Sequence, residues 1–282
     1  VKGEEPVFCL KAVKNPVEIA NTKNAHIKEG VAMARLQMCL EEKLAAGETI
    51  SETDVGELLV NFRKEQEGYM EDSFAVIAAY GANAAMMHYH PTPENHAVLQ
   101  RKGFLLLDTG GQYVDGTTDT TRTYALGELT DEERRYYTYV LKANIGIART
   151  VFMEGCSGAN LDIMSRTQVW KYGLDYRCGT GHGVGFVGPI HEGPQSLRMT
   201  NHVPFQPGMT ITDEPGIYEE GLVGVRIENE LLVVEHMETK YGKFYAFQPF
   251  TYLPIDTTPV VLELMNEEEI SWLNDYHQMV YD

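Results

Sequence analysis

The sequence predicts an α+β fold built from two related halves, each with two helices followed by strands. The first observation behind this prediction is the order of the elements. Helical patterns over residues 15–47 and 51–62 precede short apolar segments, and the same order returns after residue 130. The second is that no Gly/Ser-rich linker or low-complexity tract divides the chain, so residues 1–282 are predicted to form a single domain.

Capping residues define the predicted helices of the first half. Asn15 followed by Pro16 predicts the start of a long helix, and Gly47 predicts its end. Ser51, with Asp54 three residues later, is a variant of the capping box and predicts a second helix. Short apolar runs, partly β-branched, predict strands at residues 74–79, 104–108 and 121–125.

The second half contains similar signals. Thr130 and Glu133 form a capping box, and the pattern after it predicts a helix that reaches about Phe152. Asn266, with Glu269 at the third helical position, predicts the start of a final helix. Between them we expect a helix at residues 161–172 and strands at residues 209–212 and 223–234.

Composition excludes several classes of function. Acidic side chains outnumber basic ones by 41 to 23, which gives a net charge of −18 and argues against nucleic acid as a partner. No apolar run approaches the roughly 18–20 residues needed to span a bilayer, so no membrane association is expected. The 4 cysteines form no CxxC pair, which indicates reduced thiols and a cytoplasmic protein.

Two carboxylates lie close together around the strand predicted at residues 104–108. The apolar run that ends at Asp108 is typical of a strand buried on both faces. An ionised carboxylate at its end needs a cation, hydrogen-bond donors or solvent. The alternative is an ordinary strand-end aspartate that turns into Thr109-Gly110-Gly111. Asp119 follows 11 residues later, and two carboxylates on a strand–turn–strand unit can converge on one point.

A glycine-rich segment carries a candidate histidine. His182 lies at the centre of residues 179–185, where glycines permit close approach of the backbone. A histidine in a turn that faces solvent is the alternative. His191 follows 9 residues later, at the start of His191-Glu-Gly-Pro-Gln195.

Two further motifs end in carboxylates. Glu214 closes a predicted strand within residues 212–216. Residues 225–228 alternate apolar and polar side chains, and this period of two places Arg226 and Glu228 on one face of a sheet.

Five of these residues, in this order, resemble the five-ligand signature of the pita-bread metallopeptidases: Asp108, Asp119, His182, Glu214 and Glu228. This family includes methionine aminopeptidase, prolidase and aminopeptidase P. The local motifs are most similar to those of the large, cytosolic type of Xaa-Pro aminopeptidase, whose C-terminal catalytic domain aligns with essentially the whole chain. In that type the second histidine follows the first by nine residues, whereas prolidases usually have seven. The motifs are Asn15-Pro16-Val-Glu-Ile, His191-Glu-Gly-Pro-Gln195, Thr212-Asp-Glu-Pro-Gly216, Arg226-Ile-Glu-Asn229 and Trp272-Leu-Asn-Asp-Tyr-His277.

The resemblance implies a pita-bread fold, in which two pseudo-symmetric halves surround a curved antiparallel sheet. It also implies that Asp119 and Glu228 bridge two divalent ions, that Asp108 holds one ion, and that His182 and Glu214 hold the other. Four carboxylates gathered with one imidazole repel one another unless cations are present. Hard oxygen ligands favour Mn²⁺, with Zn²⁺, Co²⁺ or Fe²⁺ as alternatives. A deprotonated water between the ions is then expected to attack the peptide carbonyl.

The resemblance assigns roles to four further residues. His88 matches a histidine that contacts the scissile peptide, and His191 matches one that stabilises the tetrahedral intermediate. Arg226 and Tyr218 match residues that order the site through hydrogen bonds. The alternatives are a turn histidine for His88, an exposed salt bridge for Arg226 and simple packing for Tyr218.

We therefore expect an Xaa-Pro aminopeptidase, a metallopeptidase that releases the first residue from peptides with proline in second position. An Xaa-Pro dipeptidase and a metal-free binding module on the same fold are the alternatives. Because relatives pair through this domain, we expect a homodimer. The first residues, Val1–Glu5, include no initiator methionine, and the N-terminal domains of the large enzymes are missing, so we expect a chain cut from a longer protein and weakly active.

Overall fold

The computed structural model describes residues 6–282; residues 1–5, on which the expectation of a cut chain rests, lie outside this range. The helices are α1 (Pro6–Ala12), α2 (Pro16–Ala45), α3 (Glu52–Lys64), α4 (Asp131–Ala148), α5 (Gly158–Trp170) and α6 (Glu267–Tyr281), with 3₁₀ turns η1 (Gly81–Ala85) and η2 (Leu262–Leu264). None of the helices within residues 6–282 is both long enough and apolar enough to cross a membrane.

Short strands make up the rest of the regular structure. In the first half they are β1 (Tyr69–Asp72), β2 (Ile77–Tyr80), β3 (Phe104–Thr109), β4 (Gly111–Tyr113), β5 (Gly116–Thr117) and β6 (Thr120–Ala125). In the second half they are β7 (Val151–Met153), β8 (Gly181–His182), β9 (Ser196–Leu197), β10 (Thr210–Asp213), β11 (Gly216–Glu219), β12 (Val223–Arg226), β13 (Asn229–Thr239) and β14 (Gly242–Pro249).

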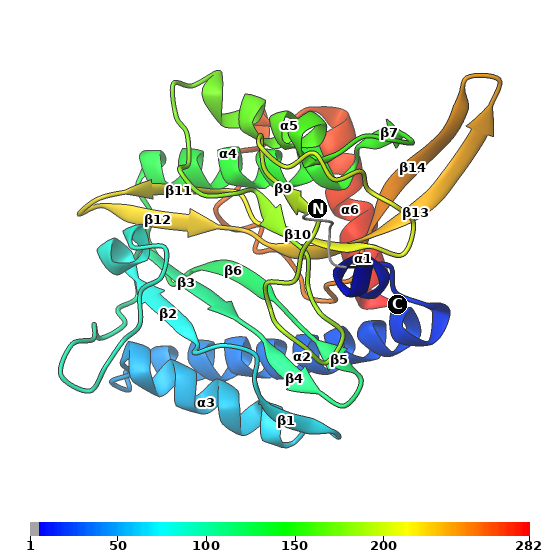
Figure 1. Cartoon of the computed structure of the whole chain (residues 1–282). Coiled ribbons are helices and arrows are strands. Elements are labelled where there is room, and N and C mark those ends of the chain that lie inside the picture. The colour runs from blue at the N-terminus through cyan, green and yellow to red at the C-terminus, as the bar shows by residue number, and fades with distance from the viewer. Residues whose placement is uncertain (1–5) are drawn as a thin grey trace.

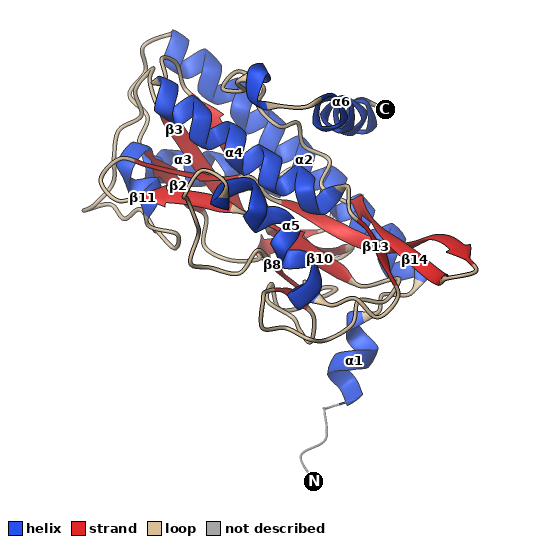
Figure 2. Cartoon of the chain, turned by 90° about the horizontal axis from the view of Figure 1, so that it is seen from above, coloured by secondary structure: helices blue, strands red, loops and turns tan. Residues whose placement is uncertain are grey.

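The two halves place their helices on either side of the strands. In Figure 1, α2 and α3 lie below the strands, whereas α4 and α5 lie above them, and the members of each pair pack against each other. In the view from above, α1 and α6 lie at opposite sides of the molecule (Figure 2). The helix–helix–strand order therefore occurs twice, and the α+β prediction is confirmed.

Antiparallel pairing brings the strand ends of both halves together. One sheet has the order β2-β3-β6, another the order β10-β13-β14-β7. The register of the first sheet pairs Asp108 with Thr121, and the register of the second pairs Asp213 with Asn229. The halves are joined directly, because the backbone N–H of Glu228 donates to the carbonyl oxygen of Thr121 at 3.1 Å.

Four predicted helix starts are confirmed, whereas the helix expected at residues 161–172 spans Gly158–Trp170. Asn15, Ser51, Thr130 and Asn266 each form a complete capping box with the third residue of the helix that follows. Such a cap satisfies backbone N–H groups that have no partner within the helix, and it contributes about 1 kcal/mol. Gly47 adopts a φ of 77° just after α2, a conformation that glycine adopts without strain, so the predicted stop is also confirmed.

Three predicted boundaries were wrong. The helix that begins at residue 131 ends at Ala148 instead of reaching Phe152, because residues 151–153 form β7 and pair with β14. The strand predicted at residues 74–79 begins only at Ile77. The strand predicted at residues 223–234 is two strands, interrupted at residues 227–228.

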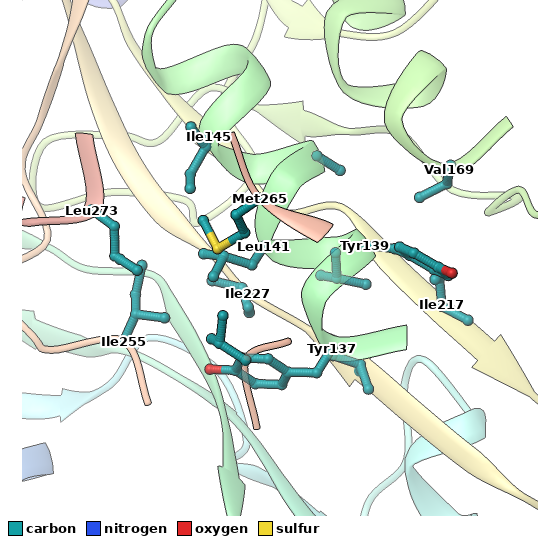
Figure 3. Close-up of a cluster of buried hydrophobic side chains, with 14 of the residues drawn as sticks. Tyr137, Tyr139, Leu141, Ile145, Val169, Ile217, Ile227, Ile255, Met265 and Leu273 are labelled. Carbon is teal, nitrogen blue, oxygen red and sulfur yellow. The ribbon is translucent and has the colours of Figure 1, made fainter. Parts of the chain in front are cut away.

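Apolar side chains from both halves support the strand ends. In the second half, Leu141 and Ile145 of α4 pack with Leu273 of α6 and with Ile227 (Figure 3). In the first half, Leu105 and Leu107 of β3 pack in the core between the sheet and helices α2 and α3, whereas Leu106 packs in a separate cluster with Ile77 and Tyr89. Strand β3 is thus buried on both faces, as predicted, and it delivers Asp108 from a rigid support.

Candidate metal centre

The predicted ligand residues meet in one cleft. Asp108 lies in β3, Asp119 precedes β6, His182 ends β8 and Glu214 follows β10, and these four side chains line a cavity of about 260 Å³. Glu228, between β12 and β13, is 1% exposed. Its carboxylate offers an oxygen within 4.8 Å of ligand atoms from Asp119 and His182.

His182 presents one ring nitrogen to the carboxylates. Its Nδ1 lies 3.0 Å from the carbonyl oxygen of Gly183, so an Nδ1–H donates there and Nε2 faces the carboxylates. Nε2 lies 3.4 Å from Oδ2 of Asp119 and 3.3 Å from Oε1 of Glu214. The glycine beside it is required, because a Cβ on Gly181 would lie 1.7 Å from the carbonyl oxygen of Thr212.

Arg226 connects several residues of the site. Its Nη2 donates to Oδ2 of Asp108 at 2.6 Å, and its Nη1 donates to the hydroxyl of Tyr218 at 2.7 Å. Its Nε donates to Oγ1 of Thr121 at 3.2 Å. Arg226 is only 3% exposed, so the alternative of an exposed salt bridge is excluded.

The carboxylates are buried beside one another. Burial, followed by the charges of Asp108 and Glu214, raises the pKa of Asp119 well above its usual range. Burial, followed by the charge of Asp119, raises the pKa of Glu228 in the same way. Oδ1 of Asp108 and Oε1 of Glu228 are buried and accept no hydrogen bond within the described part of the chain. Carboxylate oxygens that accept no hydrogen bond, grouped with an imidazole nitrogen, are the kinds of ligand that divalent cations prefer.

Histidines also line the cleft. The rings of His191 and His182 meet edge to face, with centroids 4.1 Å apart at an interplanar angle of 83°. Partial desolvation, followed by the charge of His182, lowers the pKa of His191. His88 lines the same cavity, and so does His90, which the sequence analysis does not assign to the site.

Sequence reasoning missed Thr121, whose side chain forms hydrogen bonds with both Glu228 and Arg226. Its Oγ1 donates to Oε2 of Glu228 at 2.7 Å and accepts the Nε–H of Arg226. The signal was available, because Asp119 precedes a threonine-rich strand whose alternate residues share one face.

Sequence reasoning also missed Arg122, and here no local signal exists. This residue is 0% exposed, and its guanidinium donates to the carbonyl oxygens of Glu228, Leu253 and Pro254. It also donates to Oδ1 of Asn229 at 2.9 Å. These acceptors come from distant segments, so only the folded chain reveals them.

The fold and the grouped side chains together point to the class of the metallopeptidases. A sequence profile described as Metallopeptidase family M24 matches residues 20–235, and one described as the C-terminal region of peptidase_M24 matches residues 243–282. The chain belongs to metallopeptidase family M24.

Solved structures of related proteins share the fold. The X-prolyl aminopeptidase from Caenorhabditis elegans, described as a cytosolic enzyme with a di-nuclear active site, superposes with a TM-score of 0.93 at 36% identity, over 98% of this chain and 45% of that chain. The Xaa-Pro dipeptidase from Bacillus anthracis superposes with a TM-score of 0.74 at 29% identity, over 89% of this chain and 64% of that chain. The predicted pita-bread fold is thereby confirmed.

Curated relatives are longer than this chain. Aminopeptidase P2 from Arabidopsis thaliana is 42% identical over 285 residues, which is 99% of this chain and 40% of the relative. Xaa-Pro aminopeptidase 1 from Dictyostelium discoideum is 40% identical over 98% of this chain and 45% of its own length. The chain therefore spans less than half the length of these relatives.

Proposed function

We propose that this chain is the catalytic part of an Xaa-Pro aminopeptidase, which hydrolyses the first peptide bond of substrates with proline in second position. The observation that carries the proposal is the convergence of four carboxylates and the Nε2 atom of His182 in one cleft. Relatives such as Aminopeptidase P2 and the X-prolyl aminopeptidase from C. elegans support the choice of substrate.

The four carboxylates and His182 are proposed to hold two divalent ions. The residues that would hold these ions are Asp108, Asp119, His182, Glu214 and Glu228. Oxygen ligands with a single imidazole favour Mn²⁺. When bound, such ions polarise a peptide carbonyl and lower the pKa of water.

The protein's own side chains then position the reactants. Arg226 fixes the carboxylate of Asp108 by its 2.6 Å hydrogen bond and is itself held by Tyr218. His88 is proposed to contact the scissile peptide. His191 is proposed to donate a hydrogen bond to the oxygen that gains charge as the carbonyl is attacked.

The cleft also suits a proline ring. A proline nitrogen carries no N–H, so recognition of the second residue depends on apolar contact. Phe74, Ile77 and Ile190 line the same cavity as the donors and supply an apolar wall.

Asp119→Ala tests the proposal. We expect kcat/KM for an Xaa-Pro tripeptide to fall at least about a hundredfold, because the change removes one of the five proposed metal ligands. Asp275→Ala, in an exposed residue of α6, is the matched control and is expected to keep full activity. Circular dichroism checks the fold of both variants. Unchanged turnover in Asp119→Ala contradicts the proposal.

An Xaa-Pro dipeptidase is the second candidate, favoured by the structural likeness to the B. anthracis enzyme. The nine-residue interval between His182 and His191 favours the aminopeptidase. Parallel assays of a tripeptide and a dipeptide decide between them, since a dipeptidase accepts only the dipeptide. Metal analysis of the purified protein tests the third alternative, a metal-free binding module.

Location and assembly complete the proposal. We propose a cytoplasmic protein, supported by the C. elegans relative, which is described as cytosolic. We also propose a homodimer, which light scattering at several protein concentrations tests directly; a monomeric mass at all of them contradicts it.

A further inference from the structure

The loop between β2 and β3 carries His88 to the wall of the cleft. The backbone N–H of Tyr89 donates to the carbonyl oxygen of Met86 at 3.0 Å, so Met87 and His88 are the central residues of a β-turn. Both central residues line the cleft. Because His88 is exposed, its position depends on the contacts that hold the turn.

Several of the hydrogen bonds that hold this segment converge on Glu52, the first residue of α3. Its side chain belongs to a residue with 0% exposure. Oε1 accepts the backbone N–H of Tyr80 at 2.6 Å and the side-chain amide of Asn83 at 3.0 Å. Oε2 accepts the hydroxyl of Tyr89 at 2.8 Å and the backbone N–H of Ala97 at 2.7 Å.

All four donors are uncharged, and all lie in or at the end of the segment of residues 80–97. A buried carboxylate without a cation is stable only when such donors are in place, and the N-terminus of a helix favours it further. Loss of any donor therefore leaves a buried charge less well satisfied. This dependence couples the position of the loop to α3.

The anchor lies directly beside the turn. Tyr89 is 6% exposed and packs with Ile77 and Leu106, whereas the adjacent His88 is exposed and lines the cleft. Residues 92–96, beyond the turn, are exposed and offer no second support from the core. The hydroxyl of Tyr89 on Glu52 thus fixes the residue that follows His88.

We propose that Glu52 is a positioning residue, which holds residues 80–97 through both carboxylate oxygens and thereby keeps His88 at the wall of the cleft. The inference rests on the proposed function, since it assigns His88 a contact with the substrate.

The first experiment compares Glu52→Gln with Glu57→Gln, a matched change at an exposed residue of the same helix. Glutamine places an NH₂ group against donors, so the loop must shift. A misplacement of about 1 Å can cost about a hundredfold in rate, and we expect kcat/KM to fall ten- to a hundredfold. Glu57→Gln is expected to keep wild-type kinetics. Unchanged kcat/KM in Glu52→Gln overturns the inference.

A double-mutant cycle with His88→Ala separates positioning from a general loss of structure. If Glu52 acts through His88, the Glu52→Gln change costs little in the His88→Ala background. If Glu52→Gln lowers kcat/KM by the same factor in the wild-type and His88→Ala backgrounds, the inference is overturned. Metal content is expected to be equal in all four proteins, because Glu52 contacts none of the five proposed metal ligands.

Hydrogen exchange provides a readout that needs no activity. Backbone amides of residues 80–97 are expected to exchange faster in Glu52→Gln than in Glu57→Gln, and equal exchange overturns the inference. If the wild type cleaves no Xaa-Pro peptide, the proposed function fails, but hydrogen exchange still tests whether Glu52 holds residues 80–97. If Glu52→Gln does not fold, Tyr89→Phe removes one donor and must lower kcat/KM in the same direction; an unchanged value overturns the inference.

Discussion

Glu228 and Asp119 are carboxylates that the fold removes from water and places beside further carboxylates. Burial followed by mutual repulsion raises the pKa of both side chains, so their ionised forms are unfavourable without cations. A carboxyl group whose pKa is raised on folding destabilises the folded state as pH rises above its unfolded value near 4.3. At neutral pH the metal-free site is therefore a local cost to stability.

The effect of Glu228→Gln on stability should have opposite signs in the absence and in the presence of metal ions. With a chelator present we expect the free energy of unfolding of the variant to exceed that of the wild type by about 1–3 kcal/mol, because a buried charge is removed. With excess Mn²⁺ we expect the wild type to be the more stable, because the ions stabilise only a site that binds them. Thermal unfolding under both conditions measures this. Glu238→Gln, at an exposed position, is the control, and a shift of the same sign in both conditions contradicts the account.

At the scale of elements, local caps and long-range contacts make separable contributions. Helix α4 starts at a cap made only by neighbours in sequence: Oγ1 of Thr130 accepts the N–H of Glu133, and the Glu133 side chain accepts the N–H of Thr130 at 2.7 Å. Helix α1 and the residues just after it are connected to the distant loop of His191, because Lys11 of α1 and Lys14 both contact Glu192.

Thr130→Ala should destabilise the chain by about 1 kcal/mol, because one N–H of the first turn loses its acceptor. Urea unfolding measures the loss. Thr130→Ser keeps the oxygen and is expected to retain most of the stability, so equal losses in both variants contradict the role of the cap.

Lys14→Met should cost more than Lys11→Met, although Lys11 has the shorter contact with Glu192, 2.6 Å against 3.8 Å. The Lys14 side chain is 2% exposed and that of Lys11 is 49% exposed. Removing the buried cation leaves the Val184 carbonyl without its donor, and Glu192 then has only the half-exposed Lys11 as a counter-charge, for about 1–3 kcal/mol. The exposed pair contributes about 0–1 kcal/mol. Urea unfolding of both variants is the test, and equal losses contradict it.

For the whole molecule, the C-terminal region is attached to the body through α6. The hydroxyl of Tyr276 accepts from Arg122 at 2.8 Å, and Nε2 of His277 accepts the backbone N–H of Ile255 at 3.1 Å. Burial, followed by the charge of Arg122, lowers the pKa of His277. That residues 1–282 form one cooperative domain stays a prediction, and a single unfolding transition is its expected signature.

Stability should fall as pH drops below about 6.5, partly because of His277. Its ring must stay neutral to accept the N–H of Ile255, whereas the unfolded chain binds a proton near pH 6.5. The stability that the neutral ring contributes is therefore present above that pH and is lost in acid. Urea unfolding of His277→Gln between pH 5 and pH 7.5 should show a shallower pH dependence than the wild type. An identical slope in both proteins contradicts this assignment.

The sequence alone determined the helix starts and the order of the donors. Asn15, Ser51, Thr130 and Asn266 were identified correctly because each cap involves residues only three positions apart. The residues that meet in the cleft were singled out because each lies in a short motif near a strand end and the set resembles a known signature, and their role as metal ligands stays a prediction. The alternation around Ile227 agrees with the structure, because Ile227 packs in the core whereas Arg226 and Glu228 both contact Thr121.

Only the tertiary structure decided the end of α4, the partners of Arg122 and the role of Glu52. Val151–Met153 became a strand because β14, about ninety residues later, offers an edge for pairing. Arg122 and Glu52 look like ordinary charged residues in sequence, and Glu52 finds a hydrogen-bond donor 45 positions away. Such contacts form only when packing has already brought distant segments together, so their free energy cannot be read from neighbouring residues.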